Sequence, residues 1–305
     1  MLRRNVQANQ NGGQKFLQSF DCSAFRKDIE IETMYHEITL ACEGYLYRCY
    51  QEGNADVGRM KEDFKILLDY WEKVYLRQAR MLASHYHVIL PTLEGHGEEF
   101  MTPYTSTEES AAKIIAYINE NCGGSVFAVG GVSLGGQIVM EILCQSLHIA
   151  QKAIIDGSIC VPQPRLARCC SAVIRVCWPL LFSRQACKLE AALLNKCMPK
   201  MRLPKEIVDL YMKDMPNFRK GTMCTIYRTY MAKYQLDDRI KNVTAQVLYW
   251  YGSKEMKCVK KSAAFFKSLV PSCQLYEAKG YGHGYLAVYL PEEWMKLTGP
   301  FLAQK

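Results

Sequence analysis

The sequence predicts an α/β fold, with a mostly parallel central sheet flanked by helices and an inserted helical cap. Three observations predict it. Apolar runs of strand length alternate with amphipathic segments of helix length, a pattern typical of a parallel sheet wrapped by helices. The alternation stops from about residue 160 to 240, where helical patterns punctuated by prolines take over, and it returns at residue 245. The length of 305 residues suits one large α/β domain that carries such an insertion.

Five segments have the pattern of strands in this sheet. They are short, rich in β-branched or aromatic residues, and closed by Gly, Pro or Asp. They are HVIL (87–90), SVFAVG (125–130), KAIIDG (152–157), AQVLYWYG (245–252) and, more weakly, CQLYEAKG (273–280). We also expect an antiparallel pair at the edge of the sheet over residues 38–53.

Two helices are predicted around the second of these strands. EESAAKIIAYINENCGG precedes it, with apolar residues at helical spacing and Gly123 as a stop signal. GGQIVMEILCQSLH follows it and also has a helical pattern. Residues 60–82 fit two structures: their apolar residues repeat near helical spacing, but FKILLDYW also fits a strand. We favour a strand at 65–69.

These elements divide the chain into three parts. We expect a flexible N-terminal segment over residues 1–30, a core made of residues 31–159 and 241–305, and a helical cap over residues 160–240. Helices inserted between two strands of one sheet should emerge at the carboxyl edge of the strands. That edge is where ligands bind in open α/β sheets.

The composition excludes several classes of protein. The net charge is +8, but Lys and Arg are dispersed, which indicates a solvated surface and not a nucleic-acid interface. The basic stretch from Arg165 to Arg184 is interleaved with apolar residues and leaves a transient contact with a membrane surface open. The 14 cysteines are irregularly spaced without a C-x-x-C pair, so we expect reduced thiols, no metal site and a cytoplasmic location. The longest apolar stretch is too short to span a bilayer.

Gly131-Val132-Ser133-Leu134-Gly135 is a G-x-S-x-G sequence that directly follows a predicted strand and directly opens a predicted helix. A sharp turn at this place lifts a serine Oγ clear of the sheet, and the flanking glycines leave room for the turn. The context therefore predicts that Ser133 is a nucleophile. The backbone N–H of Leu134 is then placed to bind an oxyanion.

A serine hydroxyl needs a general base, and the base needs a carboxylate. His283 lies in a Gly-rich loop after the last predicted strand and is the predicted base. Glu255 follows the strand 245–252 and is favoured as the acid, with Asp156 as its rival. The order Ser133, Glu255, His283 is the order used by α/β-hydrolases.

These pieces resemble the capped α/β-hydrolase superfamily, close to its esterase and monoacylglycerol-lipase-like members. The matching segments are VILPTLEGHGEE, FAVGGVSLGGQ, AIIDGS, VLYWYGSKE and AKGYGHGY. The resemblance implies that His96 is a structural loop residue and that no cofactor is needed. The family usually has a His-Gly pair before its first helix, whose backbone N–H completes the oxyanion hole. This chain has no His-Gly upstream of residue 95, and Tyr70 would supply that N–H if residues 65–69 form a strand.

The predicted function is that of a serine hydrolase that cleaves a carboxylic ester or thioester with an apolar acyl group. The cap is expected to close over Ser133 and to bind the acyl group through residues drawn from Val173, Val176, Trp178, Leu181, Met212 and Tyr227. Two alternatives stay open. One is a catalytically weak or inactive binding protein on the same fold, and the other is a hydrolase that acts on a C–C or amide bond. The oligomeric state is not predicted.

Overall fold

The computed structural model describes residues 75–197 and 205–304, which form part of one compact unit, Glu72–Lys305. Several expectations concern residues outside this range: the N-terminal segment 1–30, the strand pair 38–53, the strand 65–69 and the Tyr70 N–H. The described part opens with helix α4 (Leu76–Ala83), at the end of the stretch whose apolar spacing fitted a helix.

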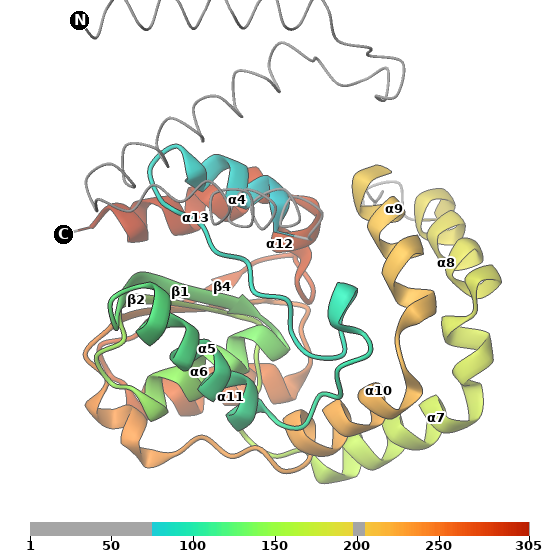
Figure 1. Ribbon diagram of the computed structural model, residues 1–305, viewed down its shortest axis with the longest axis horizontal. Coiled ribbons are helices and arrows are strands. Elements are labelled where there is room, and N and C mark those ends of the chain that lie inside the picture. The colour runs from blue at the N-terminus through green and yellow to red at the C-terminus, as the bar shows by residue number, and fades with distance from the viewer. Residues whose placement is uncertain (1–74, 198–204, 305) are drawn as a thin grey trace, which may run out of the picture. The chain divides into compact units, whose positions relative to one another are not determined.

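Four parallel strands form the sheet of the described residues, in the order β1-β2-β3-β4 (Figure 1). They are β1 (Val126–Val132), β2 (Ala150–Asp156), β3 (Gln246–Gly252) and β4 (Gln274–Ala278). Each coincides with a predicted strand to within a few residues, so the predicted parallel sheet is confirmed. The prediction was possible because helices cover both faces of a parallel sheet, which makes its inner strands read as continuous apolar runs.

The segment 87–90 does not form a strand in the described structure, so that prediction was wrong. Its four residues have strand-like composition, but a strand is defined by its ladder with a neighbour. The ladders described join β1 to β2, β2 to β3 and β3 to β4, and none includes residues 87–90.

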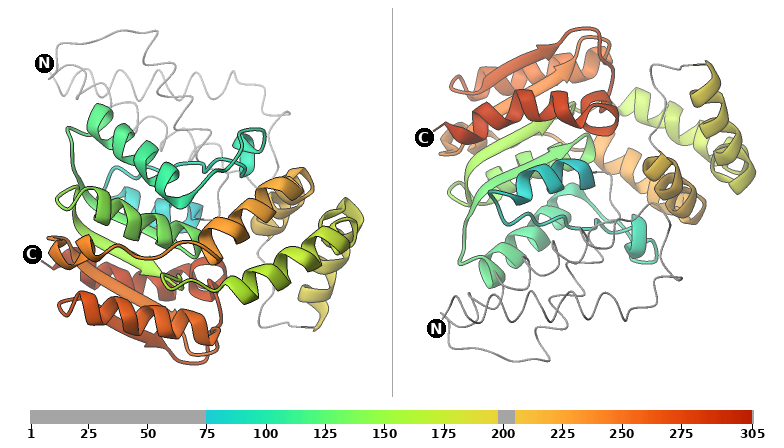
Figure 2. Two further views of the ribbon diagram at one scale, coloured as in Figure 1. Left: turned by 90° about the horizontal axis from the view of Figure 1, so that it is seen from below. Right: turned by 90° about the horizontal axis from the view of Figure 1, so that it is seen from above.

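Alternate residues of the strands face two separate hydrophobic cores, as the period of two along a strand requires. Ile155 and Tyr249 belong to a core shared with α6 (Leu134–Gln145) and α11 (Lys257–Leu269). Their neighbours Ile154 and Trp250 belong to a core on the other face. Helices α5 (Thr107–Asn121), α6 and α11 cover the first face, and α4, α12 (Tyr285–Tyr289) and α13 (Pro291–Ala303) cover the second (Figures 1 and 2).

The chain between β2 and β3 is helical in its described residues. It contains α7 (Pro164–Phe182), α8 (Arg184–Cys197), α9 (Lys205–Asp214), the 3-10 turn η5 (Met215–Asn217), α10 (Lys220–Ile226), the π-helical turn η6 (Tyr227–Met231) and the 3-10 helix η7 (Asp238–Asn242). Within residues 75–197 and 205–304, no helix is long and apolar enough to cross a membrane.

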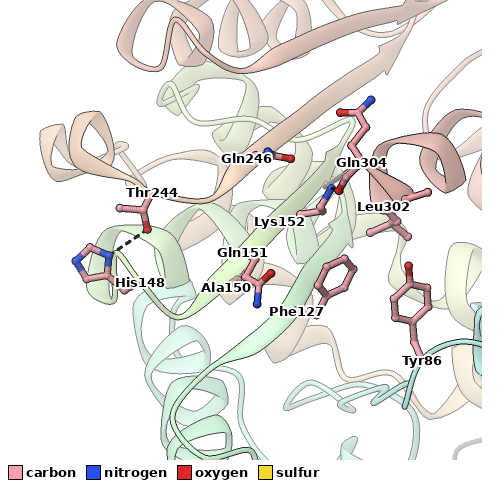
Figure 3. Close-up of a pocket in the computed structure, with 11 residues that line it drawn as sticks. Tyr86, Phe127, His148, Ala150, Gln151, Lys152, Thr244, Gln246, Leu302 and Gln304 are labelled. Carbon is pink, nitrogen blue, oxygen red and sulfur yellow. Dashed lines mark hydrogen bonds between the residues drawn. The ribbon is translucent and has the colours of Figure 1, made fainter.

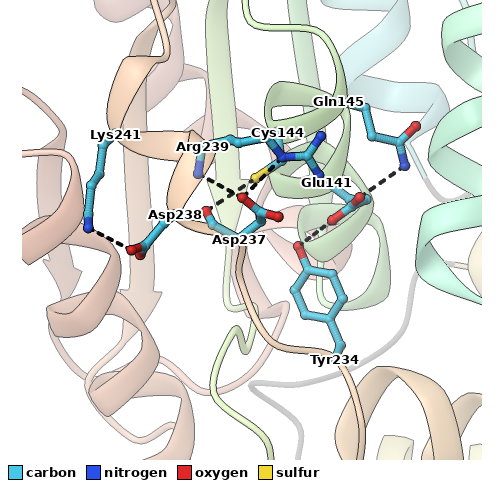
Figure 4. Close-up of polar contacts among 8 residues, drawn as sticks. All are labelled: Glu141, Cys144, Gln145, Tyr234, Asp237, Asp238, Arg239 and Lys241. Carbon is cyan, nitrogen blue, oxygen red and sulfur yellow. Dashed lines mark hydrogen bonds and ion pairs between the residues drawn. The ribbon is translucent and has the colours of Figure 1, made fainter.

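Polar contacts tie the end of this insertion to α6 (Figure 4). The Tyr234 hydroxyl donates to Oε2 of Glu141 at 3.1 Å, and Gln145 donates to the other carboxylate oxygen at 2.9 Å. The Cys144 thiol contacts the carbonyl oxygen of Asp237 at 3.8 Å. The return of the chain to the sheet is therefore fixed against the helix that starts at Ser133.

A cavity of about 710 Å³ lies at the amino edge of the strands, where Ala150 and Gln246 begin β2 and β3 (Figure 3). Beside it, buried Lys152 donates through Nζ to the carbonyl oxygens of Phe301 and Gln304 at 2.6 and 2.5 Å. A cation at a helix C-terminus stabilises α13. Lys152 is thus occupied in holding a helix end, and the cavity lies at the opposite edge of the sheet from Ser133.

Candidate active site

Ser133 occupies a strained turn between β1 and α6, with φ 55° and ψ −116°. It is the only non-glycine residue with positive φ in the part of the chain that the structure describes. Its N–H donates to the carbonyl oxygen of Asp156 at 2.8 Å, which fixes the turn against the end of β2. A Cβ on Gly131 would collide with the backbone of Gly135. Gly131 therefore serves the close approach of strand and helix that the sequence pattern indicated, whereas a Cβ on Gly135 would meet no atom within 4 Å.

The loops after β3 and β4 bring Glu255 and His283 together. Oε2 of Glu255 lies 2.8 Å from Nδ1 of His283. The Glu255 side chain is 1% exposed and the His283 side chain 49% exposed. The hydrogen bond to Glu255 raises the pKa of His283, against the opposing effect of burial. With its Nδ1 proton held by the carboxylate, the neutral imidazole presents Nε2 as an acceptor.

Glycines place this pair next to the serine turn. A Cβ on Gly157, which has φ +55°, would lie 2.6 Å from Oε1 of Glu255 and 3.2 Å from Nδ1 of His283. A Cβ on Gly284 would lie 3.7 Å from Cγ2 of Val132. Gly157 directly follows Asp156, whose carbonyl oxygen binds the Ser133 N–H. The structure thus gathers Ser133, Glu255 and His283 at the carboxyl edge of the sheet.

We expect Gly157→Ala to lower activity strongly and to lower the stability of the protein only modestly. The new methyl group must push Glu255 aside, and displacements of about 1 Å at a catalytic group can cost ~10²-fold in rate. Gly123→Ala is the matched control, because Gly123 also has positive φ (69°) but no atom within 4 Å of the new Cβ. Both variants should lose about 1–2 kcal/mol of stability from the left-handed backbone, and only Gly157→Ala should lose activity. Equal turnover in the two variants, measured with a small ester, would contradict the close packing of Gly157 against the pair.

Asp156, the rival acid, lies buried behind the pair and not at Nδ1 of His283. It is 4% exposed, and its Oδ2 has no hydrogen-bond partner among the described residues. Burial, assisted by the charge of Glu255, raises the pKa of Asp156 to about 8. A carboxyl group in such a site is stable when it carries its proton.

The raised pKa of Asp156 predicts a stability that falls with pH. Between about pH 4 and pH 8 the folded state keeps the Asp156 proton and the unfolded state does not, so rising pH favours unfolding. Asp156→Asn removes this titration while keeping a neutral side chain of the same shape. We expect the difference in unfolding free energy, variant minus wild type, to increase from pH 5 to pH 8.5 in urea titrations. A difference that stays constant over this range would show that Asp156 is ionised in the folded protein.

His96 takes a structural position. Its Nδ1 contacts the carbonyl oxygen of Glu94 at 3.0 Å, and its ring lies edge-on to Phe218 at 5.0 Å. Burial lowers the pKa of His96. Its ring is therefore engaged in closing the loop before α5.

The Leu134 N–H lies in the first turn of α6, where helix N–H groups have no intrahelical acceptor. It is therefore available to an anion above Ser133. The second predicted donor, Tyr70, lies outside the described residues.

The six predicted acyl-binding residues are dispersed. Val176 is 80% exposed and Val173 49%, while Trp178 stacks on Phe182 at 4.1 Å. Leu181 is exposed and Met212 half-buried. Tyr227 packs against an apolar cluster next to Leu134, which we call the elbow cluster; its buried members are Tyr104, Ile159, Ala167, Ile226, Tyr230, Met231, Cys258 and Val259.

Three residues near Ser133 were missed by the sequence analysis. The Ser158 hydroxyl donates to the carbonyl oxygen of Ser133, fully buried Gln137 bridges three segments, and Tyr230 comes from the insertion. The D-G-S end of β2 was a signal for Ser158. Gln137 was detectable as a polar residue in an otherwise apolar helix face.

Comparisons with known proteins agree with this fold. A model of the alpha/beta hydrolase family matches residues 68–295. That match spans most of the chain, and the chain belongs to this family. No curated protein matches the chain.

Solved structures of hydrolases share the fold at low sequence identity. A carboxylesterase of Nitrososphaera gargenis is 16% identical, with a TM-score of 0.62 over 75% of this chain and 85% of that one. A thermophilic esterase from Thermogutta terrifontis is 15% identical, with a TM-score of 0.57 over 76% and 85%. The enol-lactonase from Burkholderia xenovorans is 10% identical, with a TM-score of 0.60 over 76% and 86%. At these identities the likeness shows the fold alone.

Proposed function

We propose that this chain is a serine hydrolase that cleaves a carboxylic ester or thioester through an acyl-enzyme intermediate. Ser133 is its nucleophile, His283 its general base and Glu255 the acid that orients the base. The observation that supports this most is the 2.8 Å contact between Glu255 and His283 at the sheet edge that holds the strained Ser133.

The proposed reaction needs only these side chains. Oγ of Ser133 bonds to the carbonyl carbon, its proton passes to Nε2 of His283, and the carbonyl electron pair moves onto the oxygen. When the C=O bond re-forms, the alcohol or thiol leaves with the proton from His283. Water repeats the sequence on the acyl-serine and releases a carboxylic acid. Glu255 stabilises the imidazolium that forms in each half-reaction.

The preference for an ester has two supports. Three of the similar structures are described as a carboxylesterase, an esterase and an enol-lactonase. The elbow cluster, apolar and adjacent to Leu134, suits an apolar acyl group. We propose that the insertion between β2 and β3 selects this acyl group. Of the six residues predicted to bind the acyl group, Tyr227 is the one that packs against the elbow cluster.

Labelling with a fluorophosphonate tests the activated serine, since only such a serine reacts. We expect labelling of the full chain that is blocked by prior heat unfolding, and hydrolysis of nitrophenyl esters that depends on acyl-chain length. Absence of labelling would favour the non-catalytic binding protein. If the protein is labelled but cleaves amides in preference to esters, the proposed substrate would be an amide and not an ester.

A further inference from the structure

Tyr230 brings a phenol from the insertion to the nucleophile. It lies in the π-helical turn η6, is 8% exposed and belongs to the elbow cluster. Burial raises the pKa of Tyr230, and the neighbouring Ser133 side chain partly opposes this rise. The phenol is therefore a neutral O–H donor near Ser133 over the whole physiological pH range.

The backbone of Tyr230 is fixed to the first turn of α6. The Gln137 N–H donates to the carbonyl oxygen of Ser133 at 3.1 Å, and its side-chain amide donates to the carbonyl oxygens of Tyr230 and Ile159 at 3.0 and 2.8 Å. Thr107 in turn donates to Oε1 of Gln137 at 2.6 Å, which fixes the orientation of the amide. Because Gln137 is fully buried, these contacts hold Tyr230 in place before any substrate binds.

An acyl-transfer site needs donors at the position where the carbonyl oxygen becomes negative. The Leu134 N–H is one such donor in the described structure, and Leu134 packs against the cluster that contains Tyr230. Tyr230 and Leu134, which come from different elements, thus meet in one apolar cluster next to Ser133.

We propose that the Tyr230 hydroxyl is a donor of the oxyanion hole and acts together with the Leu134 N–H; this rests on the proposed serine-hydrolase function. The phenol keeps its proton throughout. It donates a hydrogen bond that strengthens as Oγ of Ser133 bonds to the carbonyl carbon and charge moves onto the carbonyl oxygen. The hydrogen bond weakens again when the leaving group departs with the proton from His283.

Tyr230→Phe removes only this hydroxyl and tests its role. Loss of one oxyanion donor typically lowers kcat by ~10²–10³, and KM should change little because the charge develops after binding. The affinity for a trifluoromethyl ketone, which forms a negatively charged adduct with serine, should fall by a similar factor. Tyr234→Phe is the matched control: it also removes a buried hydroxyl, but one that donates to Glu141, about two turns along α6 from Ser133.

The outcomes separate the two proposals. Wild-type protein that no fluorophosphonate labels contradicts the proposed function. Labelled wild type with a Tyr230→Phe kcat within about threefold of the Tyr234→Phe value, or a faster Tyr230→Phe enzyme, contradicts only the role of Tyr230, because the phenol would then merely hold the resting serine. Should Tyr230→Phe misfold, trifluorotyrosine at position 230 provides the second test. Its more acidic phenol should move the alkaline limb of the kcat profile to lower pH, and an unmoved limb would overturn the proposal.

Discussion

Ser133→Ala should abolish fluorophosphonate labelling and lower ester turnover by a factor of the order of 10⁶, as loss of a triad nucleophile does elsewhere. The reason is structural. Ser133 is the residue that the turn between β1 and α6 holds at φ 55°, and the hydroxyl has no substitute in that position. The backbone contacts of Ser133, from its N–H to Asp156 and from Ser158 and Gln137 to its carbonyl oxygen, do not involve its side chain, and alanine keeps them.

The fold of this variant should be unaffected, which thermal unfolding measures directly. Ser268→Ala is a suitable control, since that exposed hydroxyl donates to the carbonyl oxygen of Phe265 in its own helix at 2.7 Å. It should leave labelling unchanged. Persistent labelling of Ser133→Ala in a folded protein would mean that another residue is the nucleophile and would refute the proposed mechanism.

Glu255→Gln should lower kcat by about 10⁴, the cost of losing the carboxylate that holds a catalytic histidine in its correct tautomer. It should also move the acid limb of the pH profile. The hydrogen bond to Glu255 is the largest cause of the raised pKa of His283, so its loss lowers that pKa. His283 then becomes neutral at a lower pH, and the remaining activity should rise at a lower pH than in the wild type.

Asp156→Asn is the matched variant for this measurement, because it changes a carboxyl group that is close to the pair but not bonded to His283. We expect its kcat to stay within about tenfold of the wild type. The reverse result, a tolerant Glu255→Gln and an inactive Asp156→Asn, would make Asp156 the triad acid and would contradict the assignment drawn from the 2.8 Å contact.

The sequence was most informative where local pattern and tertiary packing agree. β2 and β3 are buried by helices, so their apolar runs identified them. In the G-x-S-x-G turn, Gly131 meets a packing requirement, because a Cβ there would collide with the backbone of Gly135. The Glu255 position followed from the loop after β3, because parallel strands deliver their following loops to one edge. The order of the segments along the sequence was therefore enough to predict that 125–130 and 245–252 lie in one parallel sheet.

Other features depend on contacts that no local pattern records. The segment 87–90 has the composition of a strand without a ladder in the described sheet. The predicted acyl-binding residues were chosen by apolarity, and Val176 is 80% exposed because α7 turns that face to solvent. Tyr230 could not be found by helical spacing, because a π-helical turn breaks the period of 3.6 residues on which such spacing rests.

The π-helical turn also makes the site sensitive to chain length in a way that ordinary substitution does not reveal. A π-turn holds one residue more than the α-helical turn it replaces, so removing a single residue from Tyr227–Met231 would restore the regular helix. Every side chain on one side of the deletion would then rotate by about 100° about the helix axis. The Tyr230 phenol would then point away from Ser133, although no catalytic residue had been substituted. Among relatives of this chain, a one-residue gap at this place would therefore mark proteins that stabilise their oxyanion differently.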